Sequence, residues 1–184
     1  MEDYGKKKDQ APAATVEAED GYSGMFPEIL QWMKRWGYSP YGTSIIAVSG
    51  CGPTWFLCWS VGLTGDKTVT PSVVADYATQ NHYVDENNDT TWAFMTSGVE
   101  HWGLTCRESN GNESEIAKEL EAGHPVICSM RPGDFTDIGH FIILTSYNNG
   151  NVTICDPFSL ENSKKSWNYS QISSQIKAVW VYSK

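Results

Sequence analysis

Apolar residues follow two patterns along this chain, with helical spacing in its first part and short β-branched or aromatic runs in its second part. Residues 55–63 are apolar at nearly every position, which is typical of a short helix buried on all sides. Residues 27–36 repeat apolar positions at helical spacing and precede Gly37, so we expect a surface helix there. Its predicted buried face consists of Ile29, Leu30, Trp32, Met33 and Trp36.

Three further helices are predicted. The first runs over residues 71–80, because Thr70 can cap it and proline fits the first turn of a helix. Two more are expected over residues 91–102 and 113–122, each followed by a glycine that can end a helix. The predicted buried side of the first consists of Val73, Val74 and Tyr77.

Five short runs after residue 103 are β-branched or aromatic, and such runs predict strands. The central runs, residues 140–147 and 152–155, are joined by Asn148-Asn149-Gly150-Asn151, where asparagine and glycine tolerate the positive φ of a hairpin turn. The other runs are residues 104–107, 125–130 and 178–182. Helices followed by an antiparallel sheet predict an α+β protein.

The start of the chain lacks such periodicity. Residues 1–24 are charged and rich in Ala, Pro and Glu, so we expect a flexible linker or tail followed by one domain over residues 25–184. Residues 38–49 contain proline and glycine and predict a loop that leads to Cys51.

The net charge of the chain limits the kinds of molecule that it can bind. The chain has 184 residues, a net charge of −9 and a pI near 4.8, which argue against nucleic acid or an anionic membrane as a partner. No apolar stretch approaches the roughly 20 residues that a membrane helix needs, so membrane insertion is not expected. The polar residues 1–8 contain no recognisable signal peptide. We expect a monomer.

The chain has five cysteines, and this odd number leaves at least one thiol unpaired unless two chains are bridged. Three of them lie in apolar runs and are expected to be small core residues: Cys58, Cys128 and Cys155. The cysteines and histidines lack the spacing of a zinc site, so no metal or other cofactor is expected. No function is assigned to His82, His101 or His124.

Candidate chemistry begins at Ser49-Gly50-Cys51-Gly52-Pro53-Thr54. The two glycines permit a sharp turn and Pro53 fits the first turn of the buried helix, which places Cys51 at the N-terminus of that helix. Exposed N–H groups and the positive end of the helix dipole favour a thiolate there, as a nucleophilic cysteine requires. A tight turn with an inert, buried cysteine fits the same residues, and this stretch alone does not decide between the two.

His140 begins one central strand, and Asp156 follows the strand that pairs with it. A hairpin that turns at residues 148–150 brings positions 140 and 156 to the same end of the pair, within about one or two residues of register. Neighbouring strands lie about 4.8 Å apart, so the imidazole and the carboxylate could form a hydrogen bond. Such a carboxylate orients a catalytic base and stabilises its protonated form. Each residue alone also fits a structural role, since Asp-Pro is a common way to leave a strand.

These blocks together resemble papain-like cysteine peptidases, and more closely the double-glycine, bacteriocin-leader peptidases of cysteine peptidase family 39 and their relatives. The matching blocks are SGCGPT at 49–54, GHFIIL at 139–144 and ICDP at 154–157, with YG at 41–42 and TP at 70–71 as further likenesses. The resemblance implies an α+β papain-like fold in which a helical half is followed by an antiparallel sheet half, with the active site between them. It also implies that Cys51 is the nucleophile, His140 the general acid–base and Asp156 the orienting residue.

One departure from the family pattern concerns the oxyanion. These families usually place a glutamine about six residues before the cysteine, and Ile45 occupies that position here. The backbone N–H of Cys51 could still bind the oxyanion, with Ser44 or Ser49 as a second donor. Loss of one donor typically costs about 10²–10³-fold in rate, which leaves a slow enzyme, another donor or a binding module as alternatives.

The resemblance implies a cysteine peptidase or amidase that hydrolyses a peptide or amide bond through the Cys51–His140–Asp156 triad and a thioester intermediate. One alternative is transfer of the acyl group to an amine, as in transglutaminase-like enzymes. The other is a catalytically weak module that binds peptide or cell wall. The expected partner is a peptide or protein substrate, and the expected location is outside or on the surface of a bacterial cell.

Overall fold

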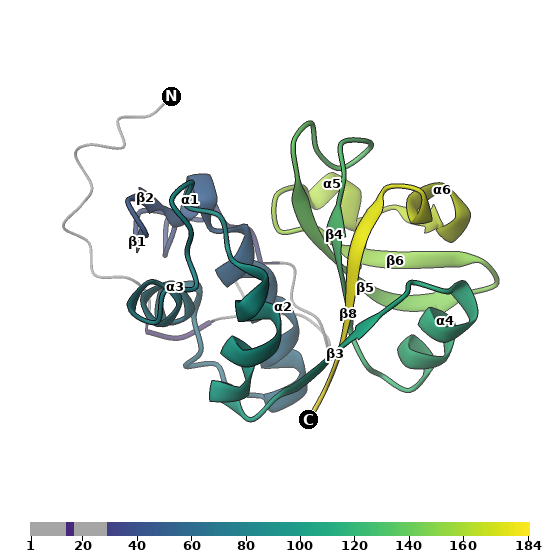
Figure 1. The fold of residues 1–184 in the computed structure, drawn as a ribbon, viewed down its shortest axis with the longest axis horizontal. Helices are drawn as coiled ribbons and strands as arrows, with labels where there is room; N and C mark the ends of the chain where they lie inside the picture. Colours follow the sequence, from purple (N-terminus) through teal and green to yellow (C-terminus); the bar gives the residue numbers. More distant parts are fainter. Residues whose placement is uncertain (1–13, 17–28) are drawn as a thin grey trace. The chain divides into compact units, whose positions relative to one another are not determined.

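The computed structural model of the protein describes residues 14–16 and 29–184, which divide into two compact units, residues 1–94 and 95–184. We call their described parts the helical half and the sheet half; Figure 1 labels the elements of each. Most of the predicted tail, residues 1–24, lies outside the described residues. Within it Val16 is fully buried, and its N–H donates to the Lys67 carbonyl at 2.9 Å. No described helix is long and apolar enough to cross a membrane.

The helical half contains a two-stranded antiparallel hairpin and three helices (Figure 1). The predicted loop over residues 38–49 is wrong in part, because these residues form the hairpin and a short helix. Gly42 has a φ of +59° and allows the tight hairpin turn. The elements are β1 (Pro40–Tyr41), β2 (Ser44–Ile45), α1 (Ile46–Ser49), α2 (Cys51–Thr64) and α3 (Pro71–Gln80).

The helix α2 is buried at every position from residue 52 to residue 61, which confirms the prediction of a helix that is apolar all round. Its aromatic side chains form the centre of the helical half. Trp55 stacks on Trp59 with ring centroids 6.3 Å apart, and Phe56 meets Phe94 edge-on at 5.7 Å. The left-handed Gly65 ends the helix.

The predicted surface helix over residues 27–36 is wrong for its described part. Residues 31–38 form a run of turns instead, closed by short-range bonds such as that from the Gly37 N–H to the Met33 carbonyl at 2.7 Å. The Leu30 carbonyl accepts from Trp36 Nε1 at 3.0 Å and from the Met33 N–H at 3.2 Å, whereas an α-helix would pair it with the N–H four residues on. Trp32, expected on the buried face, is 50 % exposed.

The helix α3 begins as predicted, with the Thr70 hydroxyl accepting from the Val73 N–H at 3.4 Å. Its buried side differs from the prediction, because Val73 is 45 % exposed. Small side chains allow α3 to pack closely on α2. The buried face of α3 therefore includes Val74, Ala75 and Ala78.

The sheet half is built on a six-stranded antiparallel sheet, which confirms the predicted strands and the α+β class. Asn149 and Gly150 have φ values of +48° and +81°, so they form the predicted two-residue hairpin turn. In spatial order the strands are β3 (Thr105–Ser109), β8 (Ile176–Ser183), β4 (Val126–Met130), β5 (His140–Asn148), β6 (Asn151–Cys155) and β7 (Ser166–Asn168).

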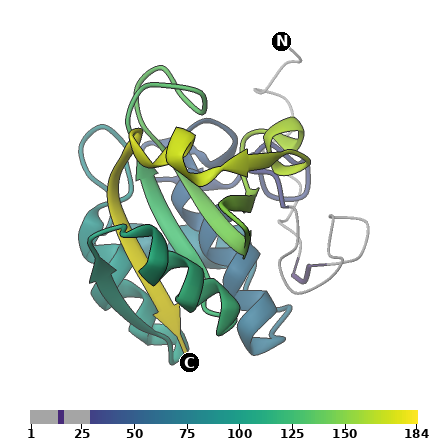
Figure 2. The ribbon, with the colours of Figure 1, turned by 90° about the vertical axis from the view of Figure 1, so that its right-hand side faces the viewer.

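Helices α4 (Glu113–Glu121) and α6 (Tyr169–Ser173) cover one face of this sheet, and Figure 2 shows α4 lying across it. Ile116 and Leu120 of α4 are buried in the core below, as the amphipathic pattern predicts. The strand residues of this core include Val126, Cys128, Ile142, Leu144, Val152, Ile154, Val179 and Val181.

The predicted helix over residues 91–102 is present but irregular. It consists of a π-helical turn, η2 (Phe94–Gly98), followed by a 3₁₀ turn, η3 (Val99–Trp102). Gly103, with a φ of +70°, ends it as predicted.

Candidate active site

Cys51 is the first residue of α2 and is partly exposed. Gly50 alone separates it from α1, and the Gly50 N–H donates to the Ile46 carbonyl at 2.7 Å. The first turn of α2 closes with the Thr54 N–H donating to the Gly50 carbonyl at 3.1 Å. The Cys51 sulfur therefore lies at the start of a helix whose backbone is hydrogen-bonded on both sides of Cys51.

The glycines on either side of Cys51 serve close packing. Gly50 has an ordinary φ of −85°, and Gly52 likewise does not have a positive φ, so neither glycine uses the left-handed region. A side chain at Gly50 would lie within 2.6 Å of the Ile46 carbonyl oxygen, and one at Gly52 would collide with the Thr90 hydroxyl. Any larger residue at these two positions would push the backbone around Cys51 out of place.

The Thr90 hydroxyl that packs against Gly52 is itself hydrogen-bonded to the Tyr41 hydroxyl at 2.5 Å. Burial raises the pKa of Tyr41 well above its ordinary range, the bond to Thr90 partly offsets this, and negative charge on Cys51 raises the pKa further. The Tyr41 phenol thus stays protonated within electrostatic range of the Cys51 sulfur.

The two serines predicted as oxyanion donors lie together, because the Ser49 hydroxyl donates to the Ser44 hydroxyl at 3.2 Å. The sequence prediction missed a third polar group beside them. Gln31 is only 3 % exposed, and its Nε2 donates to the carbonyl of Ala47, one helical turn before Cys51. Among the described residues its Oε1 has no hydrogen-bond partner. Residues 29–36 also contain the polar Lys34 and Arg35, so no signal in the sequence singled out Gln31.

In the sheet half, His140 and Asp156 form a hydrogen-bonded pair. His140 is the first residue of β5, and its Nε2 lies 2.7 Å from Oδ1 of Asp156, directly after β6. The side chains are 8 % and 1 % exposed. The hairpin geometry predicted from the sequence is therefore present at these two positions, whereas Cys51 belongs to the helical half.

A β-bulge puts these two side chains on one face of the sheet. Next to the hairpin turn, even-numbered residues of β5 lie opposite odd-numbered residues of β6. In that register His140 and Asp156 would point to opposite faces, because strand side chains alternate. The register shifts by one residue at Thr145, beyond which Leu144 pairs with Ile154 and even-numbered residues of both strands share a face.

The Asp156 carboxylate has several donors besides His140. Its Oδ1 accepts from the N–H groups of Phe158 at 2.9 Å and Ser159 at 3.2 Å, and its Oδ2 accepts from Asn162 Nδ2 at 2.9 Å. Burial alone would raise the pKa of Asp156. The hydrogen bonds and the charge of His140 outweigh burial and lower this pKa below its ordinary value. The carboxylate is therefore ionised at neutral pH.

Two exposed apolar side chains flank this pair. Ile138 is 88 % exposed two residues before His140, and Phe158 is 59 % exposed two residues after Asp156. The Phe158 ring meets the His140 ring edge-on, with centroids 6.3 Å apart. The loop before His140 is held in place by Asp134, whose carboxylate accepts from Gln171 Nε2 at 2.9 Å and Gln175 Nε2 at 2.8 Å.

All five cysteines are free thiols, and Cys58, Cys128 and Cys155 are buried as predicted. Burial raises the pKa of Cys106 to about 11, and it also raises the pKa of Cys128. These two thiols are accordingly poor nucleophiles at neutral pH.

The remaining polar clusters do not form a metal site. His124 Nδ1 lies 2.7 Å from Oε2 of Glu119. No group of three or more His, Cys, Asp or Glu side chains within the described part of the chain could hold a metal ion.

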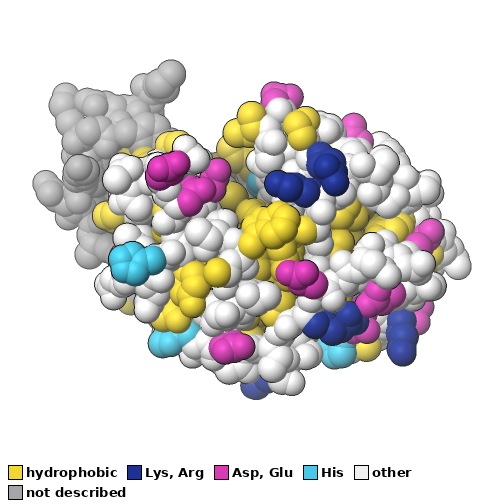
Figure 3. Space-filling model, viewed as in Figure 1, with side chains coloured by type: hydrophobic (Ala, Val, Ile, Leu, Met, Phe, Trp, Pro, Cys, Tyr) yellow, Lys and Arg dark blue, Asp and Glu magenta, His cyan; other side chains and the backbone are white. Residues whose placement is uncertain are grey.

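On the face shown in Figure 3, acidic side chains are scattered over both halves.

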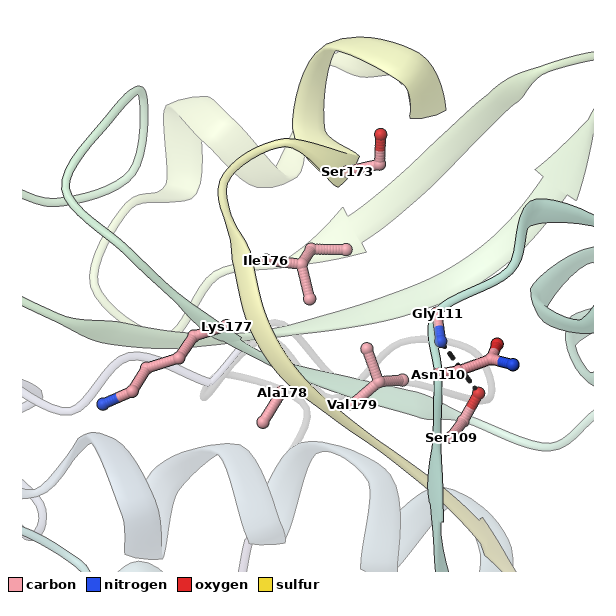
Figure 4. A pocket seen from close by; sticks show the side chains of 8 residues that line it. All are labelled: Ser109, Asn110, Gly111, Ser173, Ile176, Lys177, Ala178 and Val179. Carbon is pink, nitrogen blue, oxygen red and sulfur yellow. Dashed lines mark hydrogen bonds between the residues drawn. The ribbon is translucent and has the colours of Figure 1, made fainter.

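A cavity of about 240 Å³ lies beside β8 in the sheet half, and its lining includes none of the predicted catalytic residues. Figure 4 shows Ile176 and Val179 directed into it, while Lys177 and Ala178 point to the other side of the strand. Its full lining is Ser109, Asn110, Gly111, Ser173, Ile176, Lys177, Ala178 and Val179.

Residues 45–184 match the model of the Peptidase C39-like family. The chain belongs to the peptidase C39-like family. This confirms the resemblance drawn from the sequence, and the matched segment contains Cys51, His140 and Asp156. Comparison with curated proteins gives no match.

One solved structure agrees with this C39-like assignment at the level of the fold. The peptidase domain of Streptococcus ComA, a bi-functional ABC transporter involved in a quorum-sensing pathway, is 13 % identical and superposes with a TM-score of 0.55, over 73 % of this chain and 90 % of that one. A Bacillus anthracis protein described as a C39-like peptidase is 19 % identical, with a TM-score of 0.31 over 46 % of this chain and 55 % of that one. The first similarity supports a papain-like peptidase fold for this C39-like chain.

Proposed function

We propose that this protein is a cysteine peptidase or amidase in which Cys51 is the nucleophile, His140 the general acid–base and Asp156 the orienting carboxylate. The observation that carries the proposal is the buried hydrogen bond between His140 and Asp156 in a chain whose family is that of C39-like peptidases. A partly exposed cysteine at the start of α2 supplies the nucleophile.

The hydrogen bond assigns separate tasks to the two ring nitrogens of His140. Its Nε2 is engaged by Asp156, so in the neutral ring Nε2–H donates to the carboxylate and Nδ1 carries the lone pair. Nδ1 is then the atom that takes the proton from the Cys51 thiol. The ionised Asp156 stabilises the imidazolium that results.

In the proposed reaction the Cys51 thiolate attacks the carbonyl carbon of the scissile bond and forms a tetrahedral oxyanion. The imidazolium of His140 protonates the leaving amine as the C–N bond breaks, which leaves a thioester on Cys51. Water then attacks the thioester with His140 as base. This step releases the carboxylic acid and returns the proton to the sulfur.

The backbone N–H of Cys51 is the proposed first donor to the oxyanion. Three side chains of the helical half are candidates for the second: Ser44, Ser49 and Gln31. Ile45 occupies the position of the family's usual glutamine, and the buried Gln31 carboxamide beside α1 offers an amide donor from another part of the chain. The exposed Ile138 and Phe158 next to His140 suit a peptide or protein substrate with an apolar side chain near the scissile bond.

Alkylation with iodoacetamide, followed by peptide mass spectrometry, tests the proposal. Cys51 should react far faster than the other four cysteines at pH 7, and the protein should hydrolyse members of a peptide library. Incorporation of a primary amine in competition with hydrolysis would replace the proposal with an acyl-transfer reaction. Equal, slow labelling of all partly exposed thiols without hydrolysis would leave only a binding module.

A further inference from the structure

The geometry points to Asn162 as a positioning residue of the triad, whose carboxamide fixes the Asp156 carboxylate in the orientation that bonds His140. This inference rests on the proposed function and extends it by one residue that the sequence motifs do not include. Asn162 lies in α5 (Leu160–Ser163), six residues after Asp156.

The two oxygens of Asp156 have different partners, and Asn162 holds the one that His140 does not. Oδ1 is shared by His140 and the N–H groups of Phe158 and Ser159. Oδ2 accepts from Asn162 Nδ2 at 2.9 Å. Rotation of the carboxylate would exchange the two oxygens, so the bond from Asn162 opposes the movement that would release the His140 ring.

The Asn162 backbone is itself held by two hydrogen bonds, while its carboxamide donates to Asp156. Its N–H donates to the Ser159 hydroxyl at 3.2 Å, and its carbonyl accepts from Trp167 Nε1 at 3.0 Å. The Asp156 N–H in turn donates to the Ser163 hydroxyl at 2.8 Å. The short helix and the carboxylate therefore form one closed, bonded unit, and a residue held in this way can position another.

The environment makes this single bond important. The Asp156 side chain is 1 % exposed, so water has little access to replace a lost donor, and a buried carboxylate oxygen without a donor is costly. His140 is the charged group that acts on Asp156. Glu161 of α5 and Lys165, two residues after α5, are exposed and form an ion pair with each other, with Lys165 Nζ 2.8 Å from Glu161 Oε1.

The test compares Asn162→Ala and Asn162→Asp with the matched control Asn168→Ala. Asn168 caps α6 by accepting from the Ser170 N–H at 3.0 Å, so its substitution removes a comparable local bond away from Asp156. Asn162→Asp keeps the size of the side chain but puts a second carboxylate against Oδ2.

The first readout is the titration of the Asp156 carboxyl by ¹³C NMR, which does not depend on catalysis. Loss of a hydrogen bond to a charged group should raise the pKa of Asp156 by about one unit in Asn162→Ala, and by more in Asn162→Asp, where two carboxylates compete for one proton. Asn168→Ala should titrate like the native protein.

The second readout is turnover, where kcat should fall about tenfold or more in both Asn162 variants with little change in KM. An Asp156 titration and a kcat that match the Asn168→Ala control would overturn the inference, as would a loss of stability without either change. If the native protein neither hydrolyses peptides nor labels selectively at Cys51, the proposed function fails. The NMR titration then still shows whether Asn162 holds Asp156.

Discussion

His140 Nε2 lies 2.7 Å from Asp156 Oδ1, and the two side chains are 8 % and 1 % exposed. In so dry an environment the hydrogen bond is stronger than it would be in water, and an unpaired partner would be costly. The pair therefore acts as one unit. Removing either member is expected to change the chemistry of Cys51 more than the fold.

The first prediction concerns the nucleophile. Cys51→Ala should abolish selective alkylation and all hydrolysis, while the free energy of unfolding changes by no more than about 1 kcal/mol, because a partly exposed thiol contributes little packing. Peptide mass spectrometry and chemical denaturation measure the two effects. Cys106→Ser is the control and should leave labelling at Cys51 intact. A loss of several kcal/mol in Cys51→Ala would instead identify a structural cysteine.

The second prediction concerns the base. His140→Ala should slow alkylation of Cys51 at neutral pH, because the thiolate loses its imidazolium partner. The rate of inactivation by iodoacetamide from pH 5 to 8 measures this effect. His124→Ala is the matched control, since it removes another histidine–carboxylate contact of the sheet half, that with Glu119. An alkylation profile identical to that of the native protein would exclude His140 from the site.

The third prediction follows from the lowered pKa of Asp156 in the folded protein. The unfolded carboxyl titrates near the ordinary value of about 3.9, so the folded state binds its proton less readily. The ionised Asp156 carboxylate therefore stabilises the folded protein fully above about pH 4. This contribution to the free energy of unfolding is lost as the pH falls through the lower, folded pKa. Asp156→Asn should remove this part of the acid dependence and also lower turnover clearly.

Chemical denaturation at several values between pH 3 and pH 7 measures the acid dependence. Asp76→Asn is a control of opposite sign, because burial raises the pKa of Asp76 and its charged form is disfavoured in the folded state. That variant should not lose the acid sensitivity that Asp156 confers. An Asp156→Asn protein with the acid profile of the native protein would contradict the prediction.

The fourth prediction separates the candidate oxyanion donors. Gln31→Ala should lower kcat by about 10²–10³-fold with little change in KM, which is the usual effect of losing one donor. Ser44→Ala and Ser49→Ala, which break the hydrogen bond between the two serines, should each have a smaller effect. A larger loss of kcat in either serine variant than in Gln31→Ala would transfer the role to that serine.

Local sequence rules predicted most elements that carry the candidate residues. The turn at Asn149 and Gly150, the cap at Thr70 and the all-apolar α2 were all identified correctly, since each depends on residues within a few positions of one another. The helix over residues 27–36 failed for its described part. There the chain forms short-range turns, and the Trp36 indole binds the Leu30 carbonyl, so the helical spacing does not produce a helix.

The sequence by itself determined where Cys51, His140 and Asp156 stand along their elements: at a helix start, a strand start and a strand end. Only the tertiary structure decided on which face the last two meet. Side chains alternate with a period of two, so one unpaired residue at Thr145 places His140 on the same face as Asp156. Local residue preferences do not predict such a bulge. Burial likewise brought Gln31 beside α1, sixteen positions away from its partner Ala47, because packing against distant residues is set by the whole fold.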